Sequence, residues 1–175
     1  MPTRFEQQRL AFGRVAELYD RARPSYPRAA IDWVMEAARL KAPAQILEVG
    51  AGTGKATRLF AQRGLRVLAL EPSAEMAAVA RASCATYSRV EIVETQFESW
   101  RRGQRFPAMV SAAAWHWIDP DLRYSLAREA LAPGGTLAAM WTFPDWEPGR
   151  LRSALSAVYR AQAGAGTACR LSDAP

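Results

Sequence analysis

Three alternating glycines, Gly50, Gly52 and Gly54, are the residues whose type and spacing best suit a ligand site. They follow a short apolar run and precede a pattern of helical periodicity, which predicts a turn between a buried strand and a helix. Glycine reaches positive φ at little cost and has no side chain to keep a ligand at a distance. The helix then presents unpaired N–H groups in its first turn, with Thr53 as a candidate N-cap. The turn is therefore predicted to bind a cofactor, and a glycine turn without a ligand is the alternative.

The spacing of these glycines excludes two common phosphate-binding motifs. The dinucleotide motif needs its third glycine at position 55, where the chain has Lys55. The phosphate loop needs a glycine and a hydroxyl at positions where the chain has Val49 and Ala56. The pattern that remains is an acidic residue, Glu48, followed by three alternating glycines.

An acidic residue also ends the next predicted strand. Residues 66–71 are mostly apolar and end at Glu71, which lies 21 residues after Gly50. In a parallel α/β sheet this distance brings the acid beside a nucleoside bound at the glycine turn, where its carboxylate can accept hydrogen bonds from both ribose hydroxyls. The alternative is that Glu71 only precedes a helix, because Pro72 and Ser73 open the next helical pattern with Ser73 as N-cap.

This series of motifs resembles the class I S-adenosylmethionine-dependent methyltransferases of the type 11, trans-aconitate methyltransferase-like group. The segment 48–54 resembles their motif I, and the Leu-x-Pro-Gly-Gly pattern at 131–135 resembles a later turn of the family. The resemblance implies S-adenosylmethionine as cofactor. It assigns cofactor binding to Glu48, Gly50, Ala51, Gly52, Gly54, Glu71, Pro72, Gln96 and Phe97. Gln96 stands where the family usually has an aspartate that reaches the adenine amine, and an amide oxygen can accept the same hydrogen bond.

Residues 15–27 resemble the N-terminal cap that folds over cofactor and substrate in the same group. Tyr19 and Arg23 of this segment are predicted to bind substrate. An aromatic ring near a sulfonium can contribute a cation–π contact, and an arginine can pair with a carboxylate acceptor. Ordinary packing is the alternative for the tyrosine.

The Trp-His-Trp turn that follows the fourth predicted strand resembles motif IV of the type 11 group. Trp115 and His116 are therefore predicted to face the substrate. His116 is the single histidine of the chain and the candidate catalytic residue. It could act as a general base, or as a neutral imidazole that orients a carboxyl or hydroxyl acceptor, or it could be structural.

The predicted fold is α/β: a three-layer, Rossmann-like methyltransferase fold with a mostly parallel sheet of about five strands and helices on both faces. Strands are expected at 46–49, 66–71, 90–95, 107–114 and in the segment that ends at Trp141. Asp119 is the expected N-cap of the helix before the last strand. The whole chain, 1–175, is expected to form a single domain with a helical cap (1–44), a cofactor-binding core (45–141), and a final helix with a loose tail (142–175).

The family resemblance implies two further strands after the fifth, the last antiparallel, and this chain ends before them. We therefore expect a C-terminal truncation that leaves the fifth strand as an exposed apolar edge. The predicted function is methyl transfer to a small-molecule acceptor, a carboxylate being one candidate. The alternative is a truncated domain that binds cofactor without turnover, or that is inactive.

Composition limits the other classes of function. The net charge is +6 and the pI near 9.9, but the arginines are scattered, and the chain lacks an Asp-Pro-Pro-Tyr motif, so nucleic-acid methylation is disfavoured. Cys84 and Cys169 form no Cys-x-x-Cys motif, and no metal is predicted. The sequence has neither a membrane-spanning apolar stretch nor a signal peptide, so the cytoplasm is the expected location and no membrane partner is expected. Oligomeric state is not predicted.

Overall fold

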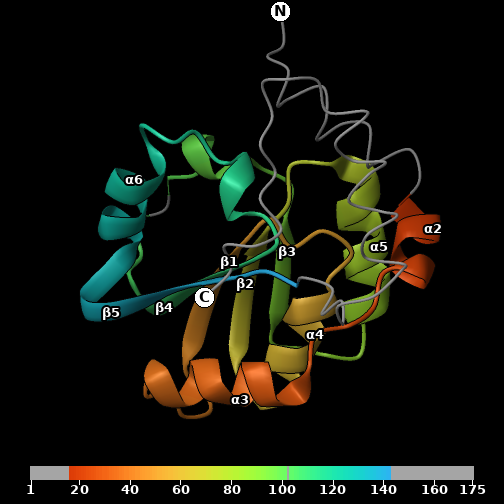
Figure 1. Cartoon of the computed structure of the whole chain (residues 1–175), viewed down its shortest axis with the longest axis horizontal. Helices are drawn as coiled ribbons and strands as arrows, with labels where there is room; N and C mark the ends of the chain where they lie inside the picture. Colours follow the sequence, from red (N-terminus) through yellow and green to blue (C-terminus); the bar gives the residue numbers. More distant parts are fainter. Residues whose placement is uncertain (1–15, 102, 143–175) are drawn as a thin grey trace, which may run out of the picture. The chain divides into compact units, whose positions relative to one another are not determined.

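Five parallel strands form one sheet in the order β3-β2-β1-β4-β5 (Figure 1). The computed structural model describes residues 16–101 and 103–142. The strands are β1 (Gln45–Val49), β2 (Arg66–Leu70), β3 (Val90–Val93), β4 (Phe106–Ala112) and β5 (Leu131–Met140). Every pairing between neighbours is parallel, which confirms the predicted α/β fold and its strand number.

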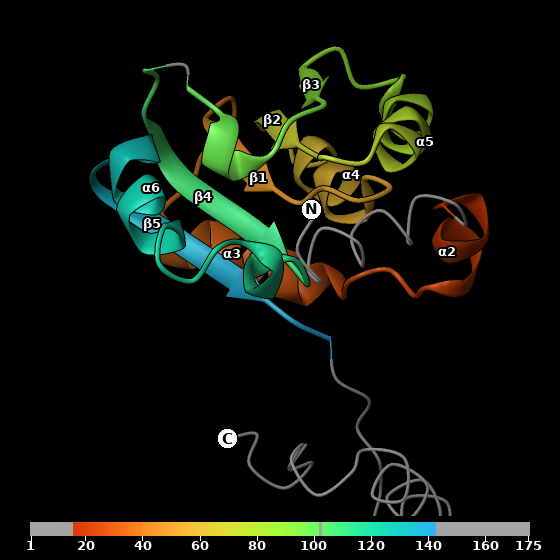
Figure 2. The same ribbon diagram turned by 90° about the horizontal axis from the view of Figure 1, so that it is seen from above.

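Helices connect and cover these strands. They are α2 (Ala16–Ala22), α3 (Arg28–Ala37), α4 (Lys55–Ala61), α5 (Ala74–Cys84) and α6 (Arg123–Ala130), with short 3₁₀ helices η1 (Phe97–Ser99) and η2 (Trp115–Trp117). Figures 1 and 2 show α6 and β5 at one end of the sheet and α5 and β3 at the other. Among the described residues, no helix is both long and apolar enough to cross a membrane.

Side chains that alternate along the strands build two separate cores, one on each face of the sheet. Ile46 packs with α3 and α4 on one face, whereas its neighbour Leu47 packs with η1, η2 and α6 on the other. Because a strand points successive side chains to opposite faces, a nearly continuous apolar run is what a sheet covered on both faces needs. Full burial of one such side chain stabilises the fold by about 2 kcal/mol.

The strand order places the carboxyl ends of β1, β2 and β4 at one edge of the sheet. From β1 the chain continues to β2 and β3 on one side, and then crosses back to β4 on the other side of β1, so this edge lies at a topological switch point. The Ser111 hydroxyl on β4 donates a buried hydrogen bond of 2.9 Å to the Val49 carbonyl at the end of β1. Ligands of open α/β sheets bind at such an edge.

The helix starts agree only in part with the sequence. Ser73 caps α5 as predicted, since its hydroxyl accepts from the Met76 N–H at 3.3 Å. The predicted caps of α4 and α6 were wrong. Gly54, and not Thr53, is the N-cap of α4, because the Thr53 hydroxyl is engaged elsewhere. The α6 helix begins only at Arg123, because Asp119 accepts a hydrogen bond from the Asp121 N–H at 2.8 Å in a preceding turn.

The Pro-Gly-Gly segment lies within β5 and not before it. Phe106 pairs with Leu131 but Ala108 pairs with Thr136, so the register shifts around the segment. Gly134 has φ +74, a conformation that favours glycine, and takes up part of this irregularity. The first part of the predicted cap, the final helix and the tail fall on residues 1–15 and 143–175, outside the described residues. Their organisation and the single-domain boundaries stay predictions.

Candidate functional site

A cavity of about 250 Å³ opens at the switch-point edge of the sheet. Its walls come from the glycine turn, the carboxyl end of β2, the turns after β3 and β4, and the segment around α2. Most of the predicted site residues line it: Tyr19, Arg23, Glu48, Gly50, Ala51, Gly52, Glu71, Pro72, Gln96, Phe97 and His116. Gly54 and Trp115 do not.

The three glycines of the turn differ in what a side chain at each position would meet. All have positive φ, namely +74 at Gly50, +57 at Gly52 and +82 at Gly54. A Cβ at Gly50 would stand 2.3 Å from the Cβ of Ala114, so the turn after β4 requires a glycine there. A Cβ at Gly52 would meet nothing within 4 Å, which leaves open space. A Cβ at Gly54 would approach α5, at 3.2 Å from the Cys84 Sγ, so this glycine serves packing.

Glu71 joins the end of β2 to the glycine turn. Its Oε2 accepts from the Gly52 N–H at 2.7 Å and its Oε1 accepts from the Ser73 N–H at 2.9 Å. The residue is only 7% exposed and lines the cavity. The carboxylate is thus held in place by backbone donors on both sides, at the position predicted for contact with ribose.

Glu48 is a buried acid that finds no hydrogen-bond partner among the described residues. It is 1% exposed, and neither of its carboxyl oxygens nor the Thr57 hydroxyl makes a hydrogen bond of normal geometry to a described residue. Burial raises the pKa of Glu48 to about 7, the Glu71 charge raises it further, and the nearby Thr57 hydroxyl opposes this. Because an unpartnered buried carboxyl is costly, its position on the cavity wall suits a cationic group of a ligand.

The turn after β3 brings Gln96 and Phe97 to the cavity. Phe97 is buried in the core shared with η2 and α6, and Gln96 precedes it in extended conformation. Phe97 therefore both packs in the core and lines the cavity. Contact of either residue with an adenine ring stays a prediction.

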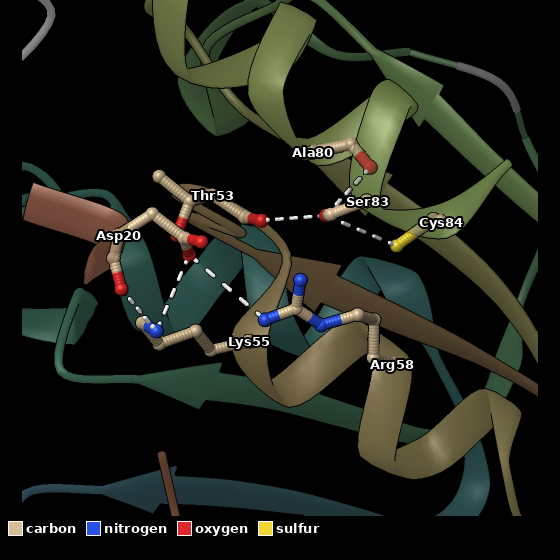
Figure 3. Close-up of polar contacts among 7 residues, drawn as sticks. All are labelled: Asp20, Thr53, Lys55, Arg58, Ala80, Ser83 and Cys84. Carbon is tan, nitrogen blue, oxygen red and sulfur yellow. Dashed lines mark hydrogen bonds and ion pairs between the residues drawn. The ribbon is translucent and has the colours of Figure 1, made fainter. Parts of the chain in front are cut away.

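The segment around α2 is tied to the glycine turn through Asp20 (Figure 3). The Thr53 hydroxyl donates to its Oδ1 at 2.6 Å, and the Lys55 Nζ donates to its backbone carbonyl at 2.6 Å. The Lys55 Nζ also lies 3.3 Å from Oδ1, and an Arg58 Nη 3.9 Å from it. Burial raises the pKa of Asp20, but these hydrogen bonds and positive charges outweigh it, and the pKa is lowered. Asp20 therefore remains ionised near neutral pH.

Tyr19, Arg23 and Tyr26 form the cavity wall on the side of α2. The Arg23 guanidinium lies 5.6 Å from the centroid of the Tyr19 ring, and no ion pair is found for it within 16–101 and 103–142. Burial raises the pKa of both phenols, that of Tyr26 to about 12, although the charge of Arg23 opposes this. The wall therefore offers two neutral aromatic rings and one cation.

His116 and Trp115 are neighbours with different surroundings. Trp115 is buried and packs edge-on against Tyr124, with ring centroids 5.5 Å apart, so its observed role is packing. His116 is exposed, lines the cavity, and its Nδ1 accepts from the Trp141 Nε1–H at 3.2 Å. Partial burial of the ring against the cavity wall and the charge of Arg23 lower the pKa of His116, which favours the neutral imidazole.

Sequence reasoning did not identify Asp20 and Trp141 as part of this site. Both act through polar contacts between elements distant in the chain, and no spacing pattern marks such contacts. A metal site is not supported by the described part of the chain, where no group of three or more His, Cys, Asp or Glu side chains could hold an ion.

Comparisons with known proteins agree with this geometry. A family model described as a methyltransferase domain matches residues 46–135. An uncharacterized methyltransferase of Mycobacterium bovis is 39% identical over 143 residues, or 82% of this chain and 56% of the relative. The trans-aconitate 2-methyltransferase of Streptomyces avermitilis is 35% identical over 102 residues, or 55% of this chain and 38% of that protein. The solved structure of a DhpI–SAH complex is 25% identical with a TM-score of 0.59, and covers 88% of this chain and 86% of that one.

The chain spans about half the length of the curated relative with the higher identity. The matched residues nevertheless include the glycine turn, the acidic end of β2 and the turns after β3 and β4. The chain therefore belongs to the methyltransferase domain family, within the class I S-adenosylmethionine-dependent methyltransferases that its motifs resemble.

Proposed function

We propose that this protein transfers the methyl group of S-adenosylmethionine to a small-molecule acceptor, with a carboxylate as the first candidate acceptor. The observation that carries the proposal is a hydrogen bond at the cavity wall, in which the Gly52 N–H donates to the Oε2 of Glu71 at 2.7 Å. Family membership and the relative named trans-aconitate 2-methyltransferase support the reaction and the acceptor class.

The residues present fit the cofactor. The space beside Gly52 is open where any other residue would carry a Cβ, and Glu48, which no other described residue hydrogen-bonds, offers its carboxyl to a cationic group. We assign Glu71 to the ribose hydroxyls, Glu48 to the amino group of the methionine part, and the turn at Gln96 and Phe97 to the adenine. Pro72 and Ala51 complete the walls. When bound, S-adenosylmethionine supplies a methyl group that is already activated by its sulfonium sulfur.

Because the donor carries the activation, the protein has to align the acceptor with the methyl group and exclude water. The rings of Tyr19 and Tyr26 line the cavity on the side of α2 and can cover a bound sulfonium by a cation–π contact. Arg23 carries no ion pair within the described chain, so it can pair with a carboxylate acceptor. This cation is our reason for preferring an anionic acceptor.

Isothermal titration with S-adenosylhomocysteine tests the cofactor site. Glu71→Ala should weaken binding by at least about tenfold, since hydrogen bonds to a charged group contribute about 1.5–3 kcal/mol. Glu129→Ala, which removes an exposed acid from α6, is the matched control and should bind as the wild type does. Equal affinity of Glu71→Ala and wild type would remove Glu71 from the site.

Transfer of a labelled methyl group to a panel of carboxylates, amines and hydroxyl compounds tests the reaction itself. Methylation of carboxylates is the expected result, and methylation confined to amines would contradict our acceptor class. Cofactor binding without methylation of any compound would favour a binding-only protein. We also propose a cytoplasmic location, which cell fractionation followed by immunodetection would test.

A further inference from the structure

The hydrogen bond between Trp141 and His116 determines which ring nitrogen of the histidine carries a proton. The indole Nε1–H can only donate, and the Nδ1 of His116 accepts from it at 3.2 Å. A nitrogen that accepts a hydrogen bond carries no proton, so the neutral imidazole must carry its proton on Nε2. The Nε2 atom has no hydrogen-bond partner within residues 16–101 and 103–142, although the ring lines the cavity.

The surroundings of His116 favour this neutral form. Partial burial and the positive charge of Arg23 both lower the pKa of the imidazole. The other charged groups on the cavity wall are engaged in contacts of their own, except Glu48, whose carboxyl makes no hydrogen bond to a described residue. Glu98 accepts from the Asp119 N–H at 3.1 Å, Glu71 holds Gly52, and Lys55 donates to Asp20.

We infer that Trp141 is a positioning residue that holds His116 as the Nε2–H tautomer, so that His116 donates a hydrogen bond to the methyl acceptor and does not remove a proton from it. The tautomer follows from the structure alone. Its consequence for the acceptor rests on the proposed methyl transfer.

This assignment restricts the class of acceptor. A lone pair of the acceptor oxygen forms the new O–CH₃ bond, while the electron pair of the breaking S–CH₃ bond stays on sulfur. For a carboxylate, the positive sulfonium and the negative oxygen thereby become a neutral thioether and a neutral ester, and no proton is released. An alcohol or a protonated amine must also lose a proton, which an Nε2–H imidazole cannot take up at Nε2. His116 and Arg23 together therefore suit a carboxylate that arrives already ionised.

Nuclear magnetic resonance of the histidine ring nitrogens tests the tautomer without any turnover. Because the chain has a single histidine, labelling the untagged protein with isotopically enriched histidine gives one pair of ring signals. At about pH 8, above the ordinary histidine pKa, we expect a protonated Nε2 and an unprotonated Nδ1, identified by their couplings to the ring hydrogens. A protonated Nδ1 would overturn the inference.

Trp141→Phe removes the indole N–H and keeps an aromatic ring. In this variant we expect the two nitrogen shifts to move towards each other as the tautomers exchange, and the pKa of His116 to rise, since the bond from Trp141 favours the neutral form. Trp33→Phe is the matched control, because Trp33 is 68% exposed on α3 and does not line the cavity. If Trp141→Phe left both the shifts and the pKa unchanged, Trp141 would not be the positioning residue.

Substitutions at His116 separate a donor from a base. Glutamine has an N–H donor but no basic nitrogen, so His116→Gln should keep clearly more kcat than His116→Ala, by a factor on the order of ten. Equal loss in both variants, with wild-type turnover intact, would overturn the donor role. If the wild type did not methylate any acceptor, the proposed function would fail, while the nitrogen spectra would still decide the tautomer.

Discussion

The Oε2 atom of Glu71 accepts a hydrogen bond of 2.7 Å from the backbone N–H of Gly52. This bond joins the carboxyl ends of two neighbouring parallel strands, and with the bond from the Ser73 N–H to Oε1 it fixes the orientation of the carboxylate. A nucleoside at this position would therefore meet a carboxylate that is already oriented. Such preorganisation lowers the entropic cost of binding.

We predict that Glu71→Gln weakens both the fold and cofactor binding. A glutamine side chain has one accepting oxygen, so it cannot accept from both Gly52 and Ser73 as Glu71 does. The lost bond should lower the free energy of unfolding by about 1–3 kcal/mol, measured by urea denaturation. The affinity for S-adenosylhomocysteine, measured by calorimetry, should fall as well. Unchanged stability would mean that the two backbone donors are satisfied in another way.

Gly52→Ala should remove cofactor binding while the fold survives. The new Cβ would meet no protein atom within 4 Å, so the cost to stability is the strain of a positive φ, about 1 kcal/mol. The Cβ would instead occupy space that we assign to the ligand. Gly103→Ala is a matched control, because Gly103 also has positive φ and open space but does not line the cavity. We expect both variants to lose a similar amount of thermal stability, and only Gly52→Ala to lose cofactor binding. If Gly52→Ala still bound the cofactor, the cofactor would have to bind elsewhere.

Glu48 should make stability depend on pH in a defined window. Its pKa rises from 4.5 to about 7 on folding, so the folded state holds a proton that the unfolded chain has released. The stabilisation is complete below about pH 4.5 and is lost as the pH rises to about 7, by an amount on the order of 3 kcal/mol. Relative to wild type, Glu48→Gln should therefore be more stable at about pH 8 than at about pH 5. If the free energies of unfolding of the two proteins changed with pH by the same amount, this prediction would be contradicted.

Proton release on ligand binding gives a second test of Glu48. A cationic group beside the carboxyl favours its charged form, so binding of S-adenosylhomocysteine at about pH 6 should expel up to one proton from the wild type. Calorimetry in buffers of different ionisation enthalpy measures this number. Adenosine, which lacks the amino-acid cation, is the control ligand. Release of the same number of protons by Glu48→Gln would exclude Glu48 as the source.

Asp20→Asn should loosen α2 from the glycine turn. The amide keeps an oxygen for the Thr53 hydroxyl but loses the charge that attracts Lys55 and Arg58. We expect faster amide hydrogen exchange in Ala16–Ala22 and an affinity for S-adenosylhomocysteine reduced several-fold, equivalent to about 1 kcal/mol.

Asp32→Asn is the control for this change. Asp32 in α3 also pairs with an arginine, Arg63, which follows α4, and neither residue lines the cavity. Its substitution should leave exchange in α2 and ligand affinity unchanged. Equal behaviour of the Asp20 and Asp32 variants would contradict a specific link between α2 and the site.

The sheet and most of the cavity wall could be predicted because their signals are local. Apolar runs ending in Gly50 and Glu71 mark strands and their carboxyl ends, and parallel topology brings these ends together. At Gly54, local sequence signals could not tell which role the glycine has. Packing against α5 and contact with a ligand both require glycine there, so the residue type alone could not separate them. Trp115 is similar, because a large aromatic residue suits a core as well as a binding wall.

Contacts between side chains that are far apart in the chain could not be predicted from the sequence. Asp20 meets Thr53 across 33 residues, and His116 meets Trp141 across 25. Such pairs follow no helical or strand period, since each depends on how two elements are placed in space. The capping error at Thr53 has the same origin, because its hydroxyl is used by α2 and is not available to α4.

Thr53 is bound on two sides by different helices. Its hydroxyl donates to Asp20 in α2, and its backbone carbonyl accepts from the Ser83 hydroxyl in α5 at 2.9 Å (Figure 3). If the cofactor occupies the glycine turn as we propose, we expect docking of α2 and this occupation to be thermodynamically linked, with the effect of each on the other equal in size. We therefore expect that even Ser83, which does not line the cavity, influences how tightly the proposed cofactor is held.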